Sequence, residues 1–156
     1  MPEDPNPFGR DLFGQQHVRV YQETDGEQGY HWRGTTILLL TTTGRSSGKP
    51  RTTPLIYGTD GDAWVVVGSK GGAPDHPDWY KNLDANPEAT IQIERERIPV
   101  RAHTARGADR ARLWQLMADV WPPYDEYQEK TDREIPVVIL ERQRRGVQTD
   151  TAATRN

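Results

Sequence analysis

Residues 35–68 read TTILLLTTTGRSSGKPRTTPLIYGTDGDAWVVVG and contain three β-rich runs, at positions 35–43, 51–57 and 63–68. Gly48 and Pro50 interrupt the chain between the first two runs, and Asp60-Gly61-Asp62 is typical of a hairpin turn between the last two. Because connections this short join antiparallel neighbours, we predict that the three runs form an antiparallel meander.

The second half of the sequence predicts three more strands. They are expected at positions 89–93, 98–104 and 135–141. The first two alternate apolar and polar residues around the charged turn 94–97, as in a hairpin. About six mainly antiparallel strands with flanking helices favour a small β-barrel of the α+β class over a doubly wound parallel sheet.

Helices are expected between these strands. Asp78 is a candidate N-cap for a helix that ends at Ala85, and Asp109 is a candidate N-cap for the next one. Leucine, methionine and valine recur at helical spacing after Asp109, which predicts a buried stripe. A further polar helix is expected over 124–133.

The two ends of the chain are more polar than its centre. We expect three parts: an N-terminal segment at 1–33, a barrel domain at 34–142 and a mobile tail at 143–156. Residues 10–23 can form a short helix that docks either on the barrel or weakly on a membrane surface through Phe8, Leu12 and Phe13.

Composition restricts the possible partners. The 156 residues carry a formal net charge of -3, which argues against nucleic acid as the main partner. Cysteine is absent, and the four histidines show no metal-ligand spacing, so we predict a protein that binds no metal. We expect it in the cytoplasm.

Two loops join small residues to positive charge. The first, Gly44 to Lys49, resembles a P-loop but has three residues between its glycines instead of four, and Pro50 replaces the Ser or Thr that would bind magnesium. The second is Gly68 to Gly72. Flexible N–H groups beside fixed cations suit a phosphate or a carboxylate, whereas the alternative for both loops is a plain solvated turn.

Aromatic residues are grouped at two further places in the sequence. Trp79-Tyr80 opens the helix after the second loop, and Trp121, Tyr124 and Tyr127 recur every three residues beside two prolines. These side chains either pack in the core or line a site where phenols contact a flat substrate or donate a proton.

Four ordered motifs give the sequence a recognisable pattern. They are TTTGRxxGxPRxxPL from Thr41, GSKGG from Gly68, HPxWYxNLxANP from His76, and WPxYxxYQ with TDRxIPV from Trp121 to Val137. Together they closely resemble the deazaflavin-dependent nitroreductase family of actinobacteria, over roughly residues 34–140. The resemblance implies a split β-barrel of the FMN-binding type that uses coenzyme F420, a deazaflavin with a phospholactyl-oligoglutamate tail.

The resemblance also implies site residues. Cofactor-binding residues would be Arg45, Ser46, Ser47, Arg51, Thr52, Thr53, Pro54, Leu55, Ile56, Val67, Gly68, Ser69, Lys70, Asp78, Trp79, Tyr80, Lys81, Asn82 and Tyr124. Trp121, Tyr127 and Tyr57 would contact the substrate. Tyr124, Ser69 and Tyr127 would be catalytic, with Tyr124 or Ser69 polarising or protonating the acceptor.

The implied activity is hydride transfer from reduced F420 to a small hydrophobic acceptor, namely a quinone, an enone or a nitroaromatic. An FMN-dependent oxidoreductase and a non-catalytic F420 carrier are the alternatives, and we expect a monomer. Two residues depart from the family pattern. Ser46 stands where many relatives have a second basic residue, which weakens the expected binding of the tail unless Lys49 substitutes, and Trp121 stands where many have Tyr.

Overall fold

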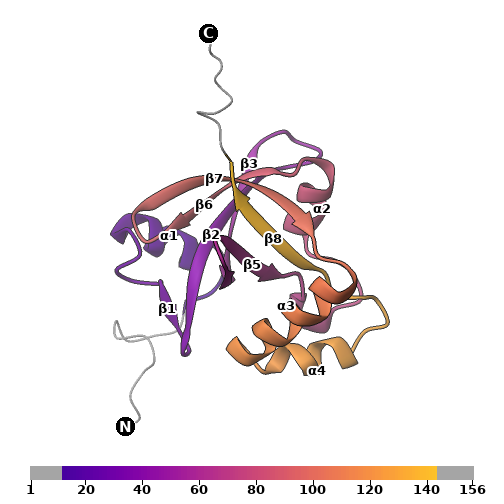
Figure 1. Cartoon of the computed structure of the whole chain (residues 1–156). Coiled ribbons are helices and arrows are strands. Elements are labelled where there is room, and N and C mark those ends of the chain that lie inside the picture. The colour runs from indigo at the N-terminus through magenta and orange to yellow at the C-terminus, as the bar shows by residue number, and fades with distance from the viewer. Residues whose placement is uncertain (1–11, 144–156) are drawn as a thin grey trace.

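The computed structural model describes residues 12–143, and within them eight strands form one curled antiparallel sheet, a split β-barrel of the α+β class with helices around it (Figure 1). The strands are β1 (His31–Trp32), β2 (Thr35–Thr43), β3 (Pro50–Ile56), β4 (Gly58–Asp60), β5 (Ala63–Val67), β6 (Glu88–Ile93), β7 (Glu96–Thr104) and β8 (Val137–Arg142). The helices are α1 (Gly14–Thr24), the short 3-10 helix η1 (Lys70–Gly72), α2 (Asp78–Ala85), α3 (Gly107–Val120) and α4 (Pro123–Glu129).

The sheet order is β1-β2-β6-β7-β8-β5-β4, with β3 paired to β2. The hairpins β2–β3, β4–β5 and β6–β7 occur where the sequence predicts them. The predicted meander is wrong, because β5 pairs with β8 rather than with the β3 region. The chain instead starts a second hairpin at Gly58, and the last strand closes the barrel against it.

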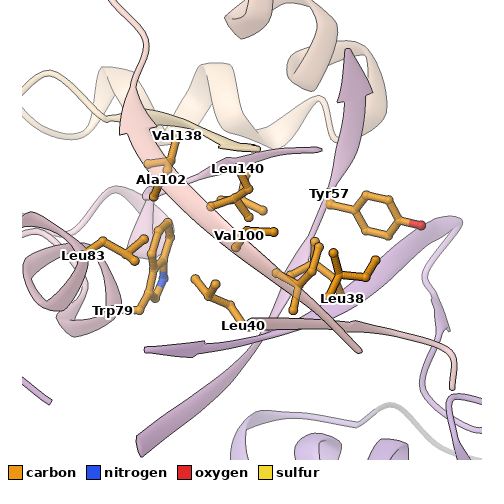
Figure 2. Close-up of a cluster of buried hydrophobic side chains, with 12 residues drawn as sticks. Leu38, Leu40, Tyr57, Trp79, Leu83, Val100, Ala102, Val138 and Leu140 are labelled. Atoms are coloured by element: carbon orange, nitrogen blue, oxygen red, sulfur yellow. The ribbon is translucent and has the colours of Figure 1, made fainter. Parts of the chain in front are cut away.

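Strand β2 is buried on both faces, which explains its unbroken apolar run. Leu38 and Leu40 point into the barrel core with Val100 and Leu140 (Figure 2). Ile37 and Leu39, the alternate residues, pack against α1. A half-buried strand would alternate with polar residues, so the sequence ILLL already indicates two covering layers.

Helix α1 docks on β2 through Val18 and Tyr21. The Tyr21 hydroxyl lies 3.0 Å from the carbonyl oxygen of Ile37 and accepts a hydrogen bond of 2.8 Å from the N–H of Glu94. Within the described residues the helix begins at Gly14, and Phe13 before it is extended. Position 10, Phe8 and the tail after residue 143 lie outside the described residues.

Helices α3 and α4 cover the outer face of β5 and β8. Leu113, Met117 and Tyr124 pack against Val65 and Val137 in a second cluster. The predicted N-caps are wrong: Pro77 and Arg106 occupy the cap positions of α2 and α3, and neither makes a side-chain capping bond. Asp78 and Asp109 lie within the first turns instead, where a carboxylate still favours the positive end of the helix.

Candidate cofactor site

Two cavities adjoin along β3 and share Thr53. The first, of about 410 Å³, is mainly apolar and aromatic; it is lined by Leu12, Phe13, Gly14, His17, Trp32, Ile37, Thr53, Pro54, Leu55, Ile56, Val67, Ser69, Lys70, Gly71, Pro77, Trp79, Trp121, Tyr124 and Tyr127. The second, of about 740 Å³, is polar; it is lined by Gln15, Val18, Gln22, Gly44, Arg45, Ser46, Ser47, Pro50, Arg51, Thr52, Thr53, Asp78 and Asn82. We call them the aromatic cavity and the basic groove.

Strand β3 borders both cavities, and only one of its two edges pairs with another strand of the described residues. Within residues 12–143 it pairs with β2 alone, and every residue of it is at least partly exposed. Pro54 lacks an N–H, as is usual for an edge strand, and Gln15 Nε2 of α1 donates 3.1 Å to the carbonyl oxygen of Thr52. A ligand can therefore lie along this edge from one cavity to the other.

The basic groove has a preformed arginine. Buried Asn82 accepts hydrogen bonds at its Oδ1 from the Arg45 backbone N–H (3.1 Å) and from Arg45 Nη1 (2.8 Å). The Asn82 Nδ2 donates 3.1 Å to Thr42 Oγ1. The buried amide thus fastens the β2–β3 loop to α2 and leaves the guanidinium at the groove.

The charge of the groove is only partly compensated. Asp78 lies 3.3 Å from Arg45 Nη2, but its side chain is 84% exposed, so the pair is weak. In the described part of the chain Lys49 and Arg51 make no salt bridge. An anion can therefore bind here without displacing a strong internal partner.

Two hydroxyl groups that line the aromatic cavity are candidates to bind a ligand. Ser69 is 8% exposed and Tyr124 is 5% exposed, and neither hydroxyl has a hydrogen-bond partner among residues 12–143. Burial, and next the nearby Tyr127, raise the pKa of the Tyr124 phenol above its usual range. The phenol therefore stays neutral near pH 7 and can donate a hydrogen bond.

The turn after β5 is tight and left-handed. Lys70, Gly71 and Gly72 all have positive φ, at 48°, 63° and 86°. A Cβ on Gly72 would lie 2.6 Å from the carbonyl oxygen of Tyr127, so only glycine lets η1 pack on α4. Lys70 and Tyr127 are brought to the same cavity in this way.

Aromatic rings form another part of the lining of the aromatic cavity. The Trp121 indole N–H donates 3.4 Å to the Tyr127 hydroxyl, and its ring lies 5.7 Å from that of Trp32. Phe13, 57% exposed, packs edge-on against Trp32 at 5.7 Å. A flat apolar ligand would meet π-faces here.

Four residues expected from the sequence line neither cavity. The hydroxyl of Tyr57, an expected substrate contact, bonds that of Tyr30 at 2.8 Å, and the ring of Tyr57 belongs to the barrel core (Figure 2). The Tyr80 hydroxyl lies 3.0 Å from Thr104 Oγ1. Lys81 forms a salt bridge with the surface residue Asp75, and Gly68 is buried beneath Pro136.

The sequence reasoning missed the contribution of α1 and β1. Leu12, Phe13, His17 and Trp32 line the aromatic cavity, and three further α1 residues line the basic groove. The spacing of apolar residues predicted that α1 docks on the protein. It did not indicate that other residues of the helix border the two cavities. His17 Nε2 lies 2.8 Å from the carbonyl oxygen of Gly29, and burial lowers the pKa of this histidine.

A split β-barrel with an aromatic cavity beside a basic groove defines a class, that of split-barrel proteins which bind a flavin-like cofactor. The profile of the F420H(2)-dependent quinone reductase family matches residues 13–142, so the chain belongs to that family. The resemblance seen in the sequence motifs is thereby confirmed, as are the oxidoreductase class and the F420 dependence.

Similar proteins agree with this assignment. An F420H(2)-dependent quinone reductase of Mycobacterium tuberculosis strain H37Rv is 44% identical over 130 residues, covering 81% of this chain and 87% of the relative. A solved F420-H2 dependent reductase, FDR-A, is 44% identical with a TM-score of 0.64, over 70% of this chain and 95% of that chain. Another solved structure, a domain-swapped dimer, is 42% identical with a TM-score of 0.66, over 81% and 95%.

Proposed function

We propose that this protein transfers a hydride from reduced coenzyme F420 to a small, hydrophobic, electron-poor acceptor, with quinones as the first class and enones and nitroaromatics as the next. The supporting observation is the meeting of the aromatic cavity and the basic groove at Thr53. A flat ring joined to a polyanionic chain needs those two environments side by side.

The basic groove fits the phosphate and glutamate groups of the tail. Arg45 and Arg51 supply charge-assisted hydrogen bonds, and Ser46 and Ser47 add hydroxyl donors. The groove is larger than the aromatic cavity, which favours an extended tail over the single phosphate of FMN. Asn82 acts through Arg45, which it holds in place.

The aromatic cavity fits the deazaflavin ring and the acceptor together. Pro54, Leu55 and Ile56 supply one wall, and Val67 and Trp79 extend it. Ser69 and Lys70 line the same cavity and offer a hydroxyl and an ammonium group to polar parts of the cofactor. The remaining wall, with Trp121 and Tyr127, is free for a planar acceptor.

When bound, the reduced coenzyme supplies a hydride. The protein contributes orientation, exclusion of water and a proton. The Tyr124 phenol, which is neutral and has no hydrogen-bond partner among residues 12–143, donates a hydrogen bond to an acceptor oxygen, with Ser69 as the second donor. One hydride and one proton convert a quinone to its hydroquinone, so Tyr124 is proposed to deliver the proton and to regain one from solvent.

Anaerobic turnover tests this function. Purified protein is mixed with a soluble naphthoquinone and, in parallel, with F420H2 or with reduced FMN, and cofactor oxidation is followed by absorbance. We expect oxidation with F420H2 that depends on both protein and quinone. Turnover with reduced FMN alone would establish the FMN alternative, and binding of F420 without oxidation by any quinone, enone or nitroaromatic would establish a carrier.

We further propose a cytoplasmic monomer that makes at most a weak contact with the inner membrane surface. Exposed Phe13 at the cavity rim supports that contact, whereas Leu12 is 2% exposed and faces the protein. No helix within residues 12–143 is long and apolar enough to span a bilayer. Flotation with anionic liposomes tests the contact: equal flotation of the wild type and Phe13→Ser would exclude it.

A further inference from the structure

One guanidinium, that of Arg133, binds both ends of the turn that carries Ser69 and Lys70. Arg133 lies between α4 and β8. Its Nη2 donates 2.7 Å to the carbonyl oxygen of Ser69, and its Nη1 donates 3.2 Å to that of Gly68. Its Nε donates 2.8 Å to the carbonyl oxygen of Ala73 at the far end of the turn.

The turn itself has little internal support. Its own backbone bonds are Gly72 N–H to Ser69 O, at 2.9 Å, and Ala73 N–H to Lys70 O, at 3.1 Å. Lys70 adopts φ of 48°, a conformation that residues other than glycine seldom take without outside restraint. Arg133 supplies that restraint from the segment between α4 and β8.

A histidine completes the arrangement. Arg133 Nη1 lies 2.9 Å from His76 Nδ1. Because a guanidinium has only donors, Nδ1 must accept this hydrogen bond, which requires neutral His76 with its proton on Nε2. The imidazole also packs edge-on against the Tyr80 ring at 4.9 Å, which connects the arrangement to α2.

We infer that Arg133 is a positioning residue: with neutral His76 it holds Ser69 and Lys70 in the geometry that the cofactor needs. This inference rests on the proposed function of the two cavities. It also makes the grip on the cofactor sensitive to pH, because a protonated His76 can no longer accept the Arg133 bond and repels the guanidinium.

The charges around His76 set the direction of that sensitivity. Burial first, and then the positive charge of Arg133, lower its pKa, with Lys81 acting in the same sense and Asp75 and Asp84 opposing them. His76 is therefore neutral at pH 7, and the arrangement is intact there. As pH falls below about 6.5 and through the lowered pKa, the histidine becomes charged and the turn loses support.

The test compares Arg133→Lys and His76→Asn with the wild type. Arg112→Lys is the matched control, because Arg112 forms a bidentate pair with Asp60 and lines neither cavity. Amide hydrogen exchange of segment 68–76 is measured without cofactor at about pH 7.5 and about pH 5.5, corrected for intrinsic rates. Affinity for oxidised F420 is measured by fluorescence at both pH values.

At the higher pH we expect Arg133→Lys to exchange faster in segment 68–76, to keep its sheet amides protected, and to bind F420 at least about tenfold more weakly. Arg112→Lys should behave as the wild type. His76→Asn, whose side-chain oxygen can take the place of Nδ1, should stay protected at both pH values, whereas the wild type loosens at the lower one.

Unchanged exchange of segment 68–76 in Arg133→Lys would overturn the inference, as would unchanged affinity for F420. If Arg133→Lys fails to fold, an identical response to pH in the wild type and in His76→Asn would also overturn the inference. A wild type that binds no F420 would instead refute the proposed function, and the exchange data would still decide whether Arg133 positions the turn.

Discussion

At the scale of single residues, the hydroxyls of Ser69 and Tyr124 are the most informative groups. Both residues are largely buried and line one mainly apolar cavity, and neither hydroxyl has a hydrogen-bond partner among residues 12–143, so both are available to a ligand. The motifs WPxYxxYQ and GSKGG pointed to both residues. Tyr57, in contrast, could be separated from the cavity only by its contact with Tyr30, which the sequence does not reveal.

Removing the Tyr124 hydroxyl should slow turnover without loosening the fold. Tyr124→Phe loses the proposed proton donor, and general acid catalysis contributes about 10²-fold or more, so we expect kcat for a quinone to fall by about that factor. F420 affinity and thermal stability should change little, because the hydroxyl has no partner within residues 12–143. Tyr80→Phe, which removes a hydroxyl outside both cavities, is the control for kinetics. A wild-type kcat in Tyr124→Phe would refute its role.

Ser46 is the weakest point of the proposed tail grip. It lines the basic groove beside Arg45 but carries no charge. Ser46→Arg should bind F420 several-fold more tightly at low salt, since a charge-assisted hydrogen bond contributes about 1.5–3 kcal/mol before screening and loss of side-chain entropy. The gain should fade at high salt and be absent for a deazaflavin without a tail. An equal gain for that tail-less ligand would contradict the assignment of the groove.

At the scale of elements, α1 is part of the site as well as a cover for β2. Its residues line both cavities, and Gln15 reaches the free edge of β3. The sequence predicted a docked helix in this region. It could not show which cavity the helix borders, because hydrophobic periodicity reports which face is buried and not what the remaining side chains approach.

The docking of α1 depends on Tyr21, which is fully buried. Burial raises the pKa of Tyr21 to about 12, so its phenol stays neutral and keeps its hydrogen bonds to β2 and to the β6–β7 turn. Tyr21→Phe leaves the Glu94 N–H unsatisfied, which should lower the free energy of unfolding by about 1–3 kcal/mol. Urea titration measures this loss. Glu23→Gln, an exposed change on the same helix, should have almost no effect, and an equal loss in both variants would contradict this account.

At the scale of the whole molecule, local pairings could be predicted from the sequence and distant ones could not. Turn chemistry identifies the hairpins β2–β3, β4–β5 and β6–β7. The pairing of β5 with β8 joins segments about 70 residues apart, and no local signal encodes it. The aromatic cavity depends on that closure, since β5 leads into the Ser69 turn and α4 leads into β8.

The central claim is that the basic groove and the aromatic cavity hold one cofactor, a deazaflavin with an anionic tail. The most direct measurement is a fluorescence titration of the protein with F420, repeated at rising salt and in competition with FMN. We predict micromolar or tighter binding of F420 that weakens as salt rises, and at least about tenfold weaker binding of FMN. No binding of F420 at micromolar concentration, or equal affinity for FMN without salt dependence, would contradict the claim.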